Sequence, residues 1–97
     1  MDAGSIVHDF RSYFSHTFAR DDMSQATYYV YTSLALTLRD RLVERCKKTQ
    51  ATYDEQGCKR TYYLSLEFLM GRAMGNAMLN LEIDPATADA LGKLGLE

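Results

Sequence analysis

A nearly uninterrupted apolar run constrains what this chain can fold into. It reads YYLSLEFLM from Tyr62 to Met70, contains the single carboxylate Glu67, and is followed by Gly71. Its aromatic residues and alternation favour a strand over 61–68, and the near-continuous apolar sequence is typical of a strand covered on both faces. Such a strand needs neighbours, because unpaired backbone donors and acceptors are costly to bury.

The sequence before this run predicts two helices. Apolar side chains recur at helical spacing and predict a helix over 6–18. Asp22 with Gln25 three residues later has the pattern of a capping box, so a long helix over 23–50 is expected to follow. Gly57, in the turn after that helix, is the residue by which helical structure is expected to have stopped. The apolar positions of the two helices are Ile6, Val7, Phe10, Phe14 and Phe18, then Tyr31, Leu34, Leu38, Leu42 and Cys46.

Two shorter helices are expected after the run. Helical spacing returns over 72–81, and Asp84 with Pro85 indicates the start of a helix over 85–94, with the aspartate as cap and the proline in the first turn. The predicted fold class is therefore mainly α with one buried-type β-strand. One such strand without a second is an incomplete architecture, so residues 1–97 are expected to be one segment of a larger α/β protein.

Composition and charge exclude several function classes. A net charge of −2 over 97 residues gives no reason to expect a nucleic acid or an anionic membrane as partner. No apolar run approaches the roughly 20 residues that span a bilayer. Cys46 and Cys58 are interpreted as free thiols in a reducing compartment. His8 and His16 lie eight residues apart, which is not the spacing of metal ligands, so no metal site is predicted.

A family resemblance is carried by two stretches. The letters RTYYLSLEFLMGRAMGNAMLNL, residues 60–81, closely resemble a sequence signature of the glycogen and starch phosphorylases, the α-1,4-glucan phosphorylases. The letters LALTLRDRLVERCKKTQATY, residues 34–53, resemble the long helix that precedes it in that family. The resemblance runs from about Phe18 to Leu81, and the YYLSLEF core followed by MGR is specific.

The resemblance implies the N-terminal segment of a large, homodimeric, cytoplasmic enzyme. Such enzymes cleave α-1,4-glucans, glycogen or starch, with inorganic phosphate and release glucose 1-phosphate. They have two Rossmann-like domains of the GT-B type. Pyridoxal 5'-phosphate is held on a lysine far toward their C-terminus, beyond the region that residues 1–97 resemble. The 97-residue chain alone is accordingly expected to bind no cofactor and to be inactive.

Family roles transfer to a few positions. Glu67 matches a carboxylate that lines the active-site cleft, and the alternative interpretation is a structural carboxylate paired with an arginine such as Arg72. Leu69 stands where many animal members have a tyrosine close to the cofactor, a departure expected to change packing rather than chemistry.

The long helix resembles the segment that carries the AMP-activation site of animal phosphorylases. Asp21 and Gln50 match family positions there, whereas Cys46 and Asp54 replace aromatic residues that contact the nucleotide. Each lost aromatic stack is worth ~1–3 kcal/mol by analogy with base stacking. AMP activation is therefore expected to be absent or weak.

A different class of protein remains an alternative. Apolar stripes on helices also occur in small helical interaction or dimerisation modules without a catalytic role. The run from Tyr62 to Met70 separates the two hypotheses, because such a module has no need for a doubly buried strand that ends near a carboxylate.

Overall fold

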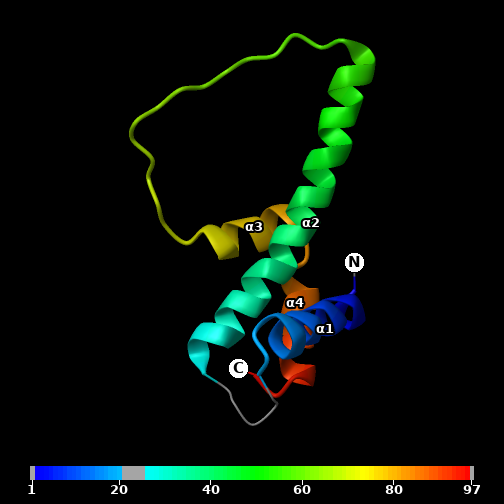
Figure 1. Ribbon diagram of the computed structural model, residues 1–97, viewed down its shortest axis with the longest axis vertical. Helices are drawn as coiled ribbons and strands as arrows, with labels where there is room; N and C mark the ends of the chain where they lie inside the picture. The colour runs from blue at the N-terminus through cyan, green and yellow to red at the C-terminus, as the bar shows by residue number, and fades with distance from the viewer. Residues whose placement is uncertain (1, 21–25, 97) are drawn as a thin grey trace.

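The computed structural model describes residues 2–20 and 26–96, and Figure 1 shows helices joined by loops over these residues. In chain order they are α1 (Ala3–Ser12), the π-helical turn η1 (Tyr13–Thr17), α2 (Thr27–Gln56), α3 (Ala73–Leu81) and α4 (Asp84–Lys93). Helix α1 packs against α2 and α4, and α3 packs against the same two helices. The four helices therefore share one core.

One apolar face of each helix lines this core. Ile6 and Ala90 are fully buried, and the rings of Phe10 and Phe14 stack with their centroids 5.7 Å apart. The predicted stripe of the first helix is thus buried at its centre, while Val7 and Phe18 are half-buried at its edges. The core residues are Ala3, Ile6, Phe10, Phe14, Leu34, Leu38, Leu81, Ile83 and Ala90.

A buried arginine fastens α1 to α2. The Arg41 side chain is 7% exposed, and its Nη1 lies 2.5 Å from Asp9 Oδ2. Arg41 Nη2 donates to Ser5 Oγ at 2.8 Å, and Nη1 also donates to the Thr37 carbonyl at 3.1 Å. A buried guanidinium needs such partners because an uncompensated charge in the interior is very costly. We refer to Arg41, Asp9 and Ser5 as the α1–α2 latch.

Helix α2 is much longer than the core that it supports. Its buried residues end at Arg41, and Leu42 is already 42% exposed. The sequence prediction of 23–50 was wrong at the C-terminal end, where the helix runs to Gln56 and stops at Gly57. The predicted capping box of Asp22 and Gln25 lies outside the described residues.

The two C-terminal helices meet at a tight corner. Helix α3 ends at Leu81, its C-cap residue Glu82 has a left-handed φ of 57°, and Ile83 precedes α4. The cap predicted at Asp84 is wrong, because Ile83 is the N-cap and no side-chain cap hydrogen bond forms. The buried Thr87 hydroxyl instead donates to the Ile83 carbonyl at 2.8 Å.

The strand predicted over 61–68 is not present. Across residues 2–20 and 26–96 no β-strand is found, so the fold of the described chain is all helical, and the mainly-α-with-one-strand prediction was wrong on this point. Leu64 is 92% exposed and Leu66 fully exposed. The sequence pattern recorded a preference for extension, but no other described segment offers a strand edge to pair with, so its backbone groups remain open to water.

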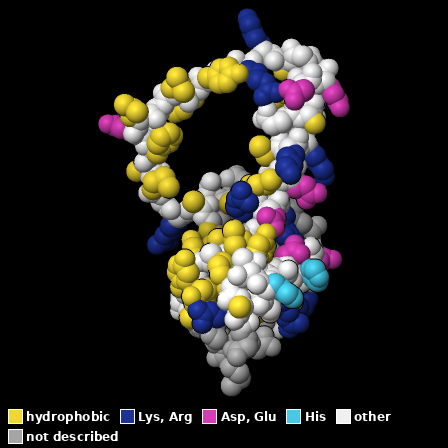
Figure 2. All heavy atoms as spheres, viewed as in Figure 1, with side chains coloured by type: hydrophobic (Ala, Val, Ile, Leu, Met, Phe, Trp, Pro, Cys, Tyr) yellow, Lys and Arg dark blue, Asp and Glu magenta, His cyan; other side chains and the backbone are white. Residues whose placement is uncertain are grey.

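This segment and the end of α2 give the molecule an open shape. The radius of gyration is 16.2 Å, against about 13 Å for a compact chain of this length. In Figure 1 residues 58–72 form a wide loop between α2 and α3, and Figure 2 shows hydrophobic side chains along it. Among the helices that the structure describes, none is long and apolar enough to cross a membrane.

Candidate functional site at the end of helix α2

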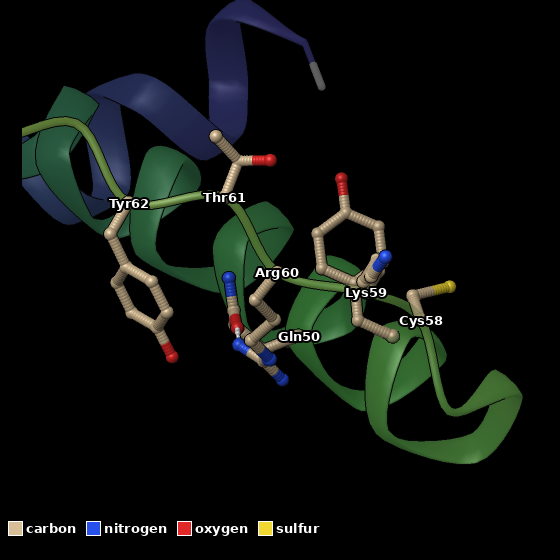
Figure 3. A pocket seen from close by; sticks show the side chains of 7 residues that line it. Gln50, Cys58, Lys59, Arg60, Thr61 and Tyr62 are labelled. Atoms are coloured by element: carbon tan, nitrogen blue, oxygen red, sulfur yellow. Dashed lines mark hydrogen bonds between the residues drawn. The ribbon is translucent and has the colours of Figure 1, made fainter.

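A pocket of about 460 Å³ lies between the end of α2 and the segment that follows it (Figure 3). Its wall combines an amide, two phenols, a thiol, a hydroxyl and two cationic side chains. A polar, cationic wall of this kind suits an anionic or hydrogen-bonding ligand better than an apolar one. The lining residues are Gln50, Tyr53, Cys58, Lys59, Arg60, Thr61 and Tyr62.

Gly57 produces the turn that builds this pocket. Its φ of 59° and ψ of 36° are left-handed, a conformation that glycine adopts without steric cost. The Gly57 N–H donates to the Asp54 carbonyl at 3.3 Å, and the Cys58 N–H donates to the Tyr53 carbonyl at 3.1 Å. These bonds satisfy the last carbonyls of the helix. The chain then leaves the end of α2, and the Arg60 side chain lies beside Gln50 of the helix, as Figure 3 shows.

Arg60 joins the segment that follows Gly57 to helix α2. Its Nη1 donates to Gln50 Oε1 and its Nη2 donates to Asp54 Oδ1. The guanidinium carbon also lies 6.0 Å from the centre of the Tyr53 ring, at the limit of a cation–π contact. Arg60 is 37% exposed and Asp54 73% exposed, so water screens the ion pair. We call the contacts of Arg60 with Gln50 and Asp54 the Arg60 clip.

The structure brings together two of the four residues matched to a nucleotide site. Gln50 lines the pocket and Asp54 binds its Arg60. Cys46 is an exposed free thiol one turn before Gln50 and does not line the pocket, and Asp21 lies outside the described residues. Sequence reasoning missed Arg60. Gln50 and Asp54, four residues apart, place two acceptors on one helix face, but this spacing does not indicate which side chain binds them.

Glu67 lies in the exposed loop, away from this pocket. Its N–H donates to Ser65 Oγ at 3.1 Å, and the same hydroxyl donates to the Glu67 carbonyl at 2.8 Å. The carboxylate forms no ion pair with Arg72 or with another residue in the described part of the chain. Neither the active-site role nor the structural pairing is tested by this arrangement.

The described residues do not form a site for pyridoxal 5'-phosphate. A Schiff base requires a lysine in an enclosed, desolvated pocket. The four lysines are exposed: Lys47, Lys48, Lys59 and Lys93. No group of three or more His, Cys, Asp or Glu side chains that could hold a metal ion is found in the described ranges.

The amino-acid sequence of this chain was compared with those of known proteins. No family model matches it. The brain form of glycogen phosphorylase from Bos taurus is 40% identical over 96 residues, which are 99% of this chain and 11% of the relative. The liver form from Homo sapiens is 42% identical over 95% of this chain and 11% of the relative. The H isozyme of α-glucan phosphorylase from Solanum tuberosum is 51% identical over 67% of this chain and 8% of the relative.

These relatives are glycogen and α-glucan phosphorylases from animals and a plant. The chain belongs to the glycogen and α-glucan phosphorylase family. It spans about a tenth of the length of the relatives that it matches.

Proposed function

We propose that this chain is the N-terminal segment of a glucan phosphorylase that cleaves α-1,4-glucans with inorganic phosphate and releases glucose 1-phosphate. The observation that carries the proposal is the 40% identity to glycogen phosphorylase along 99% of the chain. The proposal includes a homodimeric, cytoplasmic enzyme of the GT-B type whose pyridoxal 5'-phosphate is bound outside these 97 residues.

The exposed apolar surface supports a larger assembly. Tyr63, Leu64, Leu69 and Met70 are between 85% and 103% exposed. A soluble protein rarely leaves so many consecutive apolar side chains in water unless a partner covers them. In the proposed enzyme the remaining part of the polypeptide covers this segment and brings Glu67 to the glucan cleft.

The test is an assay of the protein that contains this segment within a phosphorylase-length chain. With glycogen or starch and phosphate it should release glucose 1-phosphate, and the release should depend on pyridoxal 5'-phosphate. Glu67→Gln should lower kcat, and Glu82→Gln is the matched control because Glu82 is an exposed carboxylate that caps α3 and has no proposed role in catalysis. Activity that persists without the cofactor would refute the proposal, and full activity of Glu67→Gln would refute the role of Glu67.

The 97-residue chain by itself is proposed to be inactive. Its lysines are exposed, and the walls of the pocket at the end of α2 come from one helix and one exposed segment. Incubation of the purified chain with pyridoxal 5'-phosphate followed by borohydride reduction should label no single lysine preferentially. Stoichiometric labelling of one lysine would contradict this part of the proposal.

We also propose that AMP activates the enzyme weakly. Asp54 places a carboxylate where a phosphate-bearing ligand would approach, and Arg60 already bonds to both Gln50 and Asp54. Cys46 supplies no aromatic face. AMP titration at limiting substrate should give little activation, and the double variant Cys46→Tyr with Asp54→Tyr should increase it. Strong activation of the unaltered enzyme at micromolar AMP would contradict this proposal.

A further inference from the structure

We propose that Arg60 is a positioning residue, whose clip on Gln50 and Asp54 sets the direction in which the apolar segment Tyr62–Met70 leaves helix α2. The segment makes few contacts of its own, because its large apolar side chains are 70% exposed or more. The direction in which it leaves α2 is therefore decided at its attachment to that helix. This inference concerns the chain itself and does not depend on the phosphorylase assignment.

The geometry of the clip favours an arginine. Gln50 and Asp54 are four residues apart and lie on one face of α2, about one helical turn from each other. The guanidinium presents two N–H groups in a fixed fork, so one side chain donates to both acceptors at once. A side chain held at two points swings less freely about either of them. The clip thereby favours one position of the Arg60 backbone beside α2, three residues after Gly57.

The neighbouring cation provides an internal comparison. Lys59 lines the same pocket but forms no ion pair within the described residues. An ammonium is a point donor on a flexible stem and lacks the planar fork. If charge alone held the segment, Lys59 and Arg60 would contribute alike. The clip predicts that only Arg60 matters.

The size of the effect follows from the exposure of the partners. An exposed ion pair contributes at most about a fivefold change in an equilibrium, and screening by salt reduces it. The bond to Gln50 and the contact with the Tyr53 ring act in the same direction. The clipped arrangement should therefore dominate in the unaltered chain and lose its majority when Arg60 is replaced.

Distance measurements between two spin labels test the proposal on the 97-residue chain. One label is attached to native Cys46 on α2 and the other to Leu64→Cys in the segment, with Cys58→Ser in every sample. Dilution with unlabelled chain excludes distances between molecules. Circular dichroism at 222 nm checks that α2 persists in each variant.

The unaltered background should give one narrow distance distribution, and Arg60→Gln should broaden it. Lys59→Gln should leave it narrow. Exchange of the charges by Asp54→Arg with Arg60→Asp should restore it, since the Gln50 amide can donate as well as accept. A broad distribution in the background, an unchanged distribution in Arg60→Gln, or equal broadening in Lys59→Gln would overturn the proposal.

Discussion

Removal of the Asp9 carboxylate from the α1–α2 latch should destabilise the chain more than the loss of any exposed ion pair. Arg41 is 7% exposed, and Asp9 is its carboxylate partner at 2.5 Å. In Asp9→Asn the guanidinium loses the counter-charge of Asp9 while it stays buried, and within the described residues its Nε already has no hydrogen-bond partner. Breaking a fully buried pair costs about 3–5 kcal/mol and an exposed pair about 0.2–1 kcal/mol. Because Asp9 is 36% exposed, we expect about 2 kcal/mol.

Urea unfolding followed at 222 nm measures this difference. Asp89→Asn is the matched control, since Asp89 pairs with Lys93 at 2.8 Å on α4 with both side chains more than half exposed. The control should lose no more than about 0.5 kcal/mol. Equal losses in the two variants would show that the burial of Arg41 does not govern the energy of the latch.

The pH dependence provides a second measurement of the same latch. Burial opposes ionisation of Asp9, but hydrogen bonds from His8 and Arg41 outweigh it and hold the pKa of Asp9 below its ordinary value of 3.8. A lowered pKa in the folded chain means that the stabilisation is complete above about pH 4 and is lost as pH falls through the folded value. The free energies of unfolding of the unaltered chain and Asp9→Asn should therefore converge in acid. A constant difference down to the lowest accessible pH would refute this explanation.

Three further outcomes are expected. Gly57→Ala should cost about 1 kcal/mol in urea unfolding, because a left-handed φ of 59° strains any residue with a Cβ; no loss would show that the turn relaxes. The hydrogen bond to the Asp40 carboxylate raises the pKa of Tyr13, so Asp40→Asn should move phenolate absorbance at 295 nm to lower pH; an unchanged titration would exclude the bond. Leu38→Ala should cost about 2–5 kcal/mol and Leu66→Ala almost nothing, since the first side chain is 2% exposed and the second fully exposed; similar losses would contradict the exposed loop.

The helices and the core were largely accessible to sequence reasoning, because they depend on periodic burial within the chain. Phe10, Phe14 and Leu38 were placed on apolar stripes and are buried. Beyond Arg41 the same periodicity failed, since Leu42 continues the pattern on a part of α2 that has no core to face. A pattern records what a helix would bury and cannot show whether a partner surface is available.

The strand and the candidate site were less accessible. The extended preference of residues 61–68 was read as a strand, yet strand formation requires a second segment that the described chain does not provide. The Arg60 clip depends on a turn at Gly57 that brings residues ten positions apart into contact. Such a contact has no periodic signal. The burial of Arg41 likewise has no signal in the sequence, because charged residues are almost never buried without a partner.

The unequal burial of α2 has a mechanical consequence. From Leu42 to Gln56 the helix extends about 22 Å beyond Arg41, its last buried residue. A rigid rod fixed at one end converts rotation at its support into displacement at its tip. A tilt of about 10° between α1 and α2 at the latch would move Gln56 by about 4 Å, on the rise per residue of an α-helix. A small change of helix packing around Arg41 is therefore expected to become a larger displacement at Gly57.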